Sequence, residues 1–315
     1  KPLRAGKSAG QLTKEGAWLL DPTGKLQPGA LMAPPEGDAG TGMVATNAVR
    51  KRTGNISVGT SAFSMNVLDA PLKAVHRDID IVTTPDGAPV AMVHTNNCSS
   101  DLNAWVQLFG EFAELIGHGQ TPAKLYRTLF EVSQRADRDA GGLLNYSCLS
   151  GENITDVETG RPLFVRAPHS QMNLANFMLA QLYGCFAPLK IGMDILVKEE
   201  GVQTDVMIAQ GGLFKTPVIG QQILADCLGL PITVMETAGE GGPWGMAVLA
   251  VFAKWHGERA LADFLDDEVF HNPESSTLLP TEEGRLGCQK FIAAYRAGLT
   301  VEREAGKAVA DPADA

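Results

Sequence analysis

Residues 205–235 read DVMIAQGGLFKTPVIGQQILADCLGLPITVM, and this stretch decides the fold. The short apolar run Asp205–Ala209 is typical of a buried strand, and Gly211-Gly212 follows it. Apolar residues then recur at helical spacing over Pro217–Leu228, and a glycine and a proline follow as stop signals. Ile232–Met235 is again short and apolar. The stretch therefore predicts a strand–helix–strand unit with a glycine turn between the first strand and the helix.

Three further strands are predicted ahead of this unit. Asn55–Val58 and Ala62–Leu68 flank a Gly59-Thr60 turn, which is a hairpin signal, and Val90–His94 follows an Asp86-Gly87 turn. Three strands followed by alternating helices and strands predict an α/β domain with a mixed sheet flanked by helices. That is the element order of a ribonuclease-H-like, actin-like ATPase domain. The helical patterns around these strands cover 101–116, 122–135, 172–200 and 244–255.

Weaker patterns cover the rest of the chain. Residues 1–36 are rich in glycine and proline and are expected to be irregular. Pro188 interrupts the pattern over 172–200 and is expected to kink that helix or to start a second one. Residues 305–315 are expected to form a frayed end. The other expected elements are a helix at Thr41–Val49, a strand at Leu163–Arg166, and helices at Leu261–Val269 and Glu282–Arg296.

The composition excludes several classes of protein. The chain has 315 residues, of which 44% are hydrophobic, so it can bury a core in one large unit or about two smaller ones. Its net charge is −10, and it has no basic run, so we expect no nucleic acid or anionic membrane as partner. The start, Lys1-Pro2-Leu3-Arg4, is neither an initiator methionine nor a signal peptide. We therefore expect a removed segment or a fragment.

The cysteines are odd in number and widely spaced, with no C-x-x-C pair. This pattern favours reduced thiols in a cytoplasmic protein over a disulfide framework or a zinc site. The sequence also lacks the H-E-x-x-H and G-x-S-x-G patterns of zinc peptidases and serine hydrolases. The five cysteines are Cys98, Cys148, Cys185, Cys227 and Cys288.

Asp38 lies between glycines in the run Glu36-Gly37-Asp38-Ala39-Gly40. Because glycines let the backbone come close on both sides, Asp38 can reach into a cleft as a base or a metal ligand. The alternative is an N-cap for the helix that follows.

Gly59-Thr60 and the run Ala209–Pro217 are the two turns that can hold a phosphate. The first offers N–H groups and a hydroxyl, although an ordinary hairpin turn explains it as well. The second places glycines before a helix N-terminus, where a phosphate or a flat ligand can lie. Neither matches the G-x-G-x-x-G or G-x-x-x-x-G-K-[ST] motif.

Two more glycine turns carry little information by themselves. Leu149-Ser150-Gly151-Glu152 lies in an irregular stretch, and Glu240–Gly245 opens the last apolar helix. Close contact between helices explains the second.

Several of these turns together resemble one family. Gly211–Pro217, followed by the run Gln221–Ile232, resembles a signature of the FGGY carbohydrate kinases, in which G-G-x-x-K-S/T-P precedes a helix ending in L-A-D-x-L-G-x-P-V. Gly37-Asp38 and Gly59-Thr60-Ser61 are similar to that family's G-D turn and Y-G-T-S hairpin. Leu149–Glu152 is similar to its L-S-G-E-R turn. The order and spacing also match, most closely in the xylulokinase-like and ribulokinase-like branch.

The resemblance implies a complete protein of two actin-like domains with ATP, Mg²⁺ and a sugar in the cleft between them. Residues 1–50 would end the first domain and lead out of it, 51–300 would be the second domain, and 301–315 a tail. Most of the first domain, with a Mg²⁺-binding aspartate and most sugar contacts, would be absent. The resemblance also admits a homodimer.

The resemblance implies a role for each turn. Asp38 would be the general base that takes the proton of the sugar hydroxyl, and no metal ligand would come from this chain. The nucleotide-binding residues would be Gly59, Thr60, Gly151, Gly211, Gly212 and Thr216.

Three residues depart from the family pattern. Ala39 stands where xylulokinases usually have asparagine, which weakens D-xylulose as the substrate and favours a ribulokinase-like or an unassigned ketose. Leu213 and Asn153 replace a glycine and an arginine of the nucleotide turns. The alternatives are a non-catalytic actin-like nucleotide-binding module, which has no need for Asp38, and an isolated domain without activity.

Overall fold

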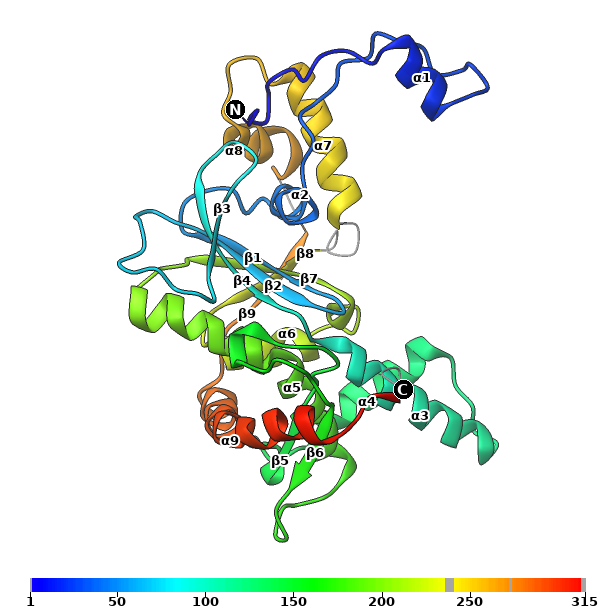
Figure 1. Cartoon of the computed structure of the whole chain (residues 1–315), viewed down its shortest axis with the longest axis vertical. Coiled ribbons are helices and arrows are strands. Elements are labelled where there is room, and N and C mark those ends of the chain that lie inside the picture. Colours follow the sequence, from blue (N-terminus) through cyan, green and yellow to red (C-terminus); the bar gives the residue numbers. More distant parts are fainter. Residues whose placement is uncertain (1, 236–240, 272–273, 313–315) are drawn as a thin grey trace.

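A computed structural model describes residues 2–235, 241–271 and 274–312, and a seven-stranded sheet lies at its centre (Figure 1). The strand order across the sheet is β3-β4-β2-β1-β7-β8-β9. The strands are β1 (Thr53–Val58), β2 (Ala62–Val67), β3 (Asp80–Thr83), β4 (Pro89–Thr95), β7 (Val206–Gly211), β8 (Ile232–Met235) and β9 (Ser275–Leu278).

The sheet contains both parallel and antiparallel pairs, as predicted. β1 pairs antiparallel with β2, which in turn pairs antiparallel with β4. β7 runs parallel to both β1 and β8. The mixed sheet predicted from five strands is therefore confirmed, and all five lie in it.

Helices cover both faces of the sheet. Apolar residues of α2, α7 and α8 pack on one face with Met65 and Val67 of β2. A larger core on the other face joins Ile56 and Met207 to α3, α4, α5, α6 and α9. Figure 1 shows the sheet between these two groups, with α1 projecting away. The helices are α1 (Lys14–Leu20), α2 (Asp38–Ala45), α3 (Ser99–Leu115), α4 (Pro122–Ser133), α5 (Leu174–Asp194), α6 (Ile219–Leu228), α7 (Gly241–Trp255), α8 (Leu261–Phe264) and α9 (Glu282–Ala308).

The helix α5 runs through Pro188, so of the two expected alternatives, a kink or a second helix, the second helix is wrong. A proline has no N–H to donate to the carbonyl four residues earlier, which is that of Gly184. The Ser147 hydroxyl donates to this carbonyl instead, at 3.4 Å. α5 is buried along most of its length, and its packing offsets the lost bond.

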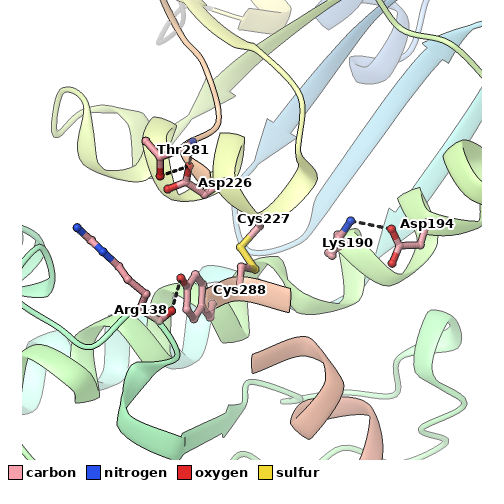
Figure 2. Close-up of a disulfide and its surroundings, with 8 residues drawn as sticks. Arg138, Lys190, Asp194, Asp226, Cys227, Thr281 and Cys288 are labelled. Carbon is pink, nitrogen blue, oxygen red and sulfur yellow. Dashed lines mark hydrogen bonds and ion pairs between the residues drawn. A yellow bond between two sulfur atoms is a disulfide. The ribbon is translucent and has the colours of Figure 1, made fainter. Parts of the chain in front are cut away.

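The expectation of five free thiols is wrong for two of them. Cys227 near the end of α6 and Cys288 on α9 form a disulfide, with their Cα atoms 5.3 Å apart (Figure 2). The two residues are 61 positions apart, and only the packing of α9 against α6 brings them together. Spacing in the sequence carries no sign of such a contact. Cys98, Cys148 and Cys185 are buried free thiols, as predicted.

Other differences lie at the margins of the fold. Residues 1–36 are not irregular throughout, because Thr13 caps α1 by accepting the N–H of Gly16. α9 continues through residue 300 to Ala308, so the frayed end is shorter than expected. The predicted strand Leu163–Arg166, β6, forms a separate two-stranded sheet with β5 (Leu143–Tyr146). No helix within the described ranges is long and apolar enough to span a membrane.

Candidate nucleotide site

Two of the predicted turns meet at one edge of the sheet. β1 and β7 are parallel, and their last paired residues are Val58 and Gly211. Gly59-Thr60 and Gly212 follow directly, so the two turns are neighbours. Gly211 has a φ of +118°, and a Cβ there would lie 2.0 Å from the Val58 carbonyl oxygen. Glycine is therefore required at this crossing of the two chains.

Backbone and hydroxyl contacts hold the Gly59-Thr60 turn. The N–H of Cys98 donates to the Thr60 carbonyl at 2.8 Å. The Ser99 hydroxyl donates to the Gly59 carbonyl at 2.6 Å, and its N–H does so at 3.2 Å. Gly59 and Thr60 themselves are exposed. The turn is thus fixed to the corner between β4 and α3 and still open to a ligand.

The same corner holds the turn that contains Gly151. Asn97 is 4% exposed, and its Oδ1 accepts the N–H of Ser150 at 3.0 Å. Its Nδ2 lies 3.2 Å from the Ser150 carbonyl and 3.3 Å from that of Gly151. Asn96 donates from Nδ2 to the Gly151 carbonyl at 2.8 Å. Asn96–Ser99 therefore links Gly151 to Gly59 and Thr60, a role that sequence reasoning missed.

Glu152 supports the corner between β4 and α3. Its side chain is fully buried, and its Oε2 accepts the backbone N–H groups of Asn96 and Asn97 at 2.9 and 3.1 Å. Burial raises the pKa of this carboxyl above its ordinary value, while the hydrogen bonds from Asn97 and Asn96 lower it. Glu152 in the L-S-G-E turn is thus a structural support for the β4–α3 corner and the Gly151 turn.

The turn after β7 forms one wall of a cleft of about 600 Å³. Gly211, Lys215 and Val218 line it on this side, and β8 and the start of β9 line it on the other. Val218 has a φ of +72°, a conformation that a β-branched residue rarely adopts, immediately before α6. Such strain is typical of functional turns. The cleft is lined by one cation, Lys215, and one carboxylate, Glu274. Lys215 was not among the predicted site residues.

Gly212 and Thr216 adjoin this cleft. Gly212 is exposed, and a Cβ there would meet no atom within 4 Å. Thr216 is half-buried between Lys215 and Val218, which both line the cleft. The structure therefore brings Gly59, Thr60, Gly211 and Gly212 to one edge, with Gly151 tied to it and Thr216 beside the cleft.

Asp38 is exposed as the first residue of α2. The N-cap is Gly37, so Asp38 is not the cap that the sequence offered as an alternative. Its Oδ1 accepts the N–H of Ala39 at 2.9 Å. The carboxylate thus stands at the helix N-terminus, where the macrodipole stabilises its charge.

Close contacts fix the position of α2. A Cβ on Gly245 of α7 would lie 1.9 Å from the Thr41 carbonyl oxygen, which confirms the close helix contact expected there; Glu240 lies outside the described residues. A Cβ on Gly42 would lie 2.8 Å from Nε2 of Gln210 in β7. The helix that carries Asp38 is therefore seated directly on the strand that leads to Gly211.

Two buried amides under α2 were not predicted. Asn55 is 0% exposed, and neither its Oδ1 nor its Nδ2 has a hydrogen-bond partner among the described residues. The same holds for Oε1 of Gln210. Buried amides normally have hydrogen-bond partners. The contact between α2 and the sheet therefore contains donors and acceptors that are not used within the described residues.

The described residues contain no group of three histidine, cysteine, aspartate or glutamate side chains that could hold a metal ion. The donors at the sheet edge are backbone N–H groups, hydroxyls and Lys215. These groups are hydrogen-bond donors and suit phosphate oxygens.

The sequence model for the FGGY family of carbohydrate kinases, C-terminal domain, matches residues 54–254. The chain belongs to this family. The match spans β1 to the end of α7 and includes every predicted nucleotide turn. The predicted family is therefore confirmed. No curated protein sequence matches the chain.

Solved structures of kinases share the fold. A ligand-bound xylulose kinase from Lactobacillus acidophilus superposes with a TM-score of 0.75 at 18% identity, covering 97% of this chain and 58% of that one. A gluconate kinase from the same organism gives a TM-score of 0.71 at 17% identity, with 97% and 57% covered. A glycerol kinase from Plasmodium falciparum with ADP gives 0.67 at 13%, with 94% and 55% covered.

The chain thus spans a little over half the length of these FGGY-like structures. At such low identities the likeness shows the fold alone. It confirms the predicted fold class, an actin-like ATPase domain with a mixed sheet flanked by helices.

Proposed function

We propose that the complete protein transfers the γ-phosphoryl group of ATP to a sugar hydroxyl and that this chain supplies the nucleotide-binding half. The convergence of Gly59-Thr60 with Gly211-Gly212 at one sheet edge carries this proposal. A chain of net charge −10 needs local donors to hold a polyphosphate. Neighbouring glycine turns provide backbone N–H groups, and Lys215 adds a positive charge.

In this proposal the nucleotide lies along the edge that β1 and β7 share. The phosphates contact Gly59, Thr60 and Gly212, and the cleft of about 600 Å³ takes the nucleoside. That volume is within the usual range for a small-molecule pocket. Mg²⁺ would neutralise charge on the phosphates when bound. Because this chain offers no metal cluster in its described part, we assign the metal ligands to the rest of the protein.

Asp38 is the proposed general base. Phosphoryl transfer needs positioning and charge neutralisation more than covalent help, and a carboxylate in reach of the attacking hydroxyl can accept its proton. Asp38 is exposed and makes one side-chain hydrogen bond, to its neighbour Ala39, so it is available to a substrate. α2, seated on Gln210 and α7, gives it a fixed support.

The proposed substrate is a ketopentose such as ribulose or xylulose. The family resemblance of the sequence motifs supports this choice. Xylulose, gluconate and glycerol kinases all share the fold, so the fold by itself does not select the acceptor.

The test is ADP release by the complete protein, with MgATP and a panel of ketopentoses, gluconate and glycerol. We expect turnover with a ketopentose, and an Asp38→Asn variant with kcat lower by about 10²–10⁴. Because Gly37 caps α2 and Asp38 is exposed, the melting temperature should fall by only about 1–3 °C, from the lost interaction of the charge with the helix dipole. Normal turnover by the variant would remove the catalytic role of Asp38. Nucleotide binding without turnover on any acceptor would favour a non-catalytic module.

A further inference from the structure

A second cavity, of about 400 Å³, lies at the far end of α6 from the nucleotide turn. It is bordered by the C-terminal end of α5, the helical turn Ile195–Glu200 that follows, the end of α6 and one side of α9. Four cationic side chains and one carboxylate line it, which gives a net of three positive charges in a chain of net charge −10. The charged residues are Lys190, Asp194, Lys198, Arg285 and Arg296.

The carboxylate of Asp194 lies within 4 Å of three of these cations. Oδ1 of Asp194 accepts from Lys190 Nζ at 2.7 Å, and Oδ2 lies 3.0 Å from Lys198 Nζ. The guanidinium of Arg296 is 3.7 Å from the same Oδ2, too far for a good hydrogen bond. Asp194 therefore neutralises one of the three charges and leaves donors of Arg296 without a close acceptor in this cluster.

The remaining cation has its own partner. Arg285 pairs with Glu282 of the same helix, with 2.7 Å between Nη2 and Oε1. Counting Glu282, the excess at the cavity is still two positive charges. The C-terminus of α6, at Leu228, also faces it and contributes a partial charge of about −0.5. That partial charge is smaller than the excess, so the helix end alone does not account for the cluster.

The disulfide holds this arrangement together. Cys288 lies between Arg285 and Arg296 in the sequence of α9. Its bond to Cys227 joins α9 to the end of α6 (Figure 2). Lys190 is only 16% exposed, so its charge is partly desolvated and interacts more strongly with a ligand than a surface charge does. The cations thus line a preformed cavity.

We propose that this cavity binds a small molecule that carries a phosphate group. A phosphate dianion matches the excess of two charges, and guanidinium groups bind its oxygens in pairs. The volume suits a phosphate with a small organic part, for which Leu228 and Ile292 provide apolar walls. The ten residues of α6 span about 15 Å, so the site is separate from the nucleotide cleft.

The test is calorimetric titration of the complete protein with inorganic phosphate and, separately, with methyl phosphate. The variant Lys198→Gln/Arg296→Gln removes two half-exposed cations from the cavity. We expect its Kd for phosphate to rise by about tenfold, from the loss of two charges that act on a dianion at a few ångströms. The variant Lys124→Gln/Arg127→Gln is the matched control, because it removes two exposed cations from α4. Its Kd should stay at the wild-type value.

Tighter binding of methyl phosphate than of inorganic phosphate would identify a phosphate monoester as the ligand, and the reverse would identify the free anion. Equal affinity of the two double variants for phosphate, or no binding by the wild type at millimolar concentration, would overturn the proposal. A Lys215→Gln variant separates the two sites. If that change alone abolished phosphate binding, the anion would belong to the nucleotide turn and the cavity would have no role.

Discussion

Replacement of Asn97 by alanine tests whether the corner between β4 and α3 holds the turns together. The Asn97 amide contacts Ser150, Gly151 and Glu152, whereas the next residue along the corner, Cys98, holds Thr60. Alanine removes all the amide contacts and keeps the backbone. Asn96→Ala is the matched control, since the Asn96 side chain makes one hydrogen bond, to the Gly151 carbonyl, and is exposed.

The expected cost follows from these contacts. Oδ1 of Asn97 accepts from the Ser150 N–H and hydroxyl at 3.0 and 3.2 Å. Nδ2 has two hydrogens for three nearby acceptors, so it makes about two bonds at a time. Four buried or part-buried hydrogen bonds at about 1 kcal/mol each, discounted for non-additivity, give about 3 kcal/mol. The single exposed bond of Asn96 gives at most about 1 kcal/mol.

The assay has two parts. Urea unfolding of the 315-residue chain, followed by tryptophan fluorescence, gives the change in the free energy of unfolding for each variant. Titration of the complete protein with MgADP gives the Kd, which should rise by about tenfold in Asn97→Ala, because a loosened Gly151 turn loses a contact worth about 1.4 kcal/mol. If Asn97→Ala costs no more stability than Asn96→Ala, the corner does not have the structural role assigned to it.

Two further predictions concern stability. Dithiothreitol or the Cys227→Ala/Cys288→Ala pair should lower the free energy of unfolding of the chain by about 4 kcal/mol, which is the loop-closure entropy for a sequence separation of 61 residues. The reductant should have no effect on the double variant, and equal stability of the wild type with and without reductant would contradict the bond. Burial of Glu302 raises the pKa of its carboxyl from 4.5 to about 7. The folded state then binds more protons than the unfolded state between these pH values, so stability should fall by up to about 3 kcal/mol as the pH rises from 4.5 through 7. Glu302→Gln should flatten this part of the denaturation profile, and an unchanged slope would refute the assignment.

The sequence predicted the centre of the fold because each central element has a strong local pattern. Asp205–Ala209, Pro217–Leu228 and Ile232–Met235 are apolar runs separated by glycine and proline, and all three appear near their expected places as β7, α6 and β8. β3 and β9 were missed because they are short edge strands with mostly exposed residues and so have no apolar run.

Features that depend on contacts between distant segments could not be predicted from local sequence patterns. The Cys227–Cys288 bond and the unbroken α5 both follow from packing between segments far apart in the sequence. The candidate site likewise has residues that a local motif predicts and residues that only the fold brings together. The glycine turns were visible as motifs, but Asn97 became visible only once β4 and the Gly151 turn were side by side.

Binding of MgATP to a Gly212→Asp variant of the complete protein tests the nucleotide site most directly. A Cβ at Gly212 meets no atom within 4 Å, and its φ is not positive, so the fold should accept aspartate there. Thr128→Asp, on the exposed side of α4, adds the same charge far from the turn as a control. A carboxylate a few ångströms from the phosphates should weaken binding by at least tenfold, measured by calorimetry, while the control keeps the wild-type Kd. Undiminished binding by Gly212→Asp would contradict the placement of the nucleotide at this edge of the sheet.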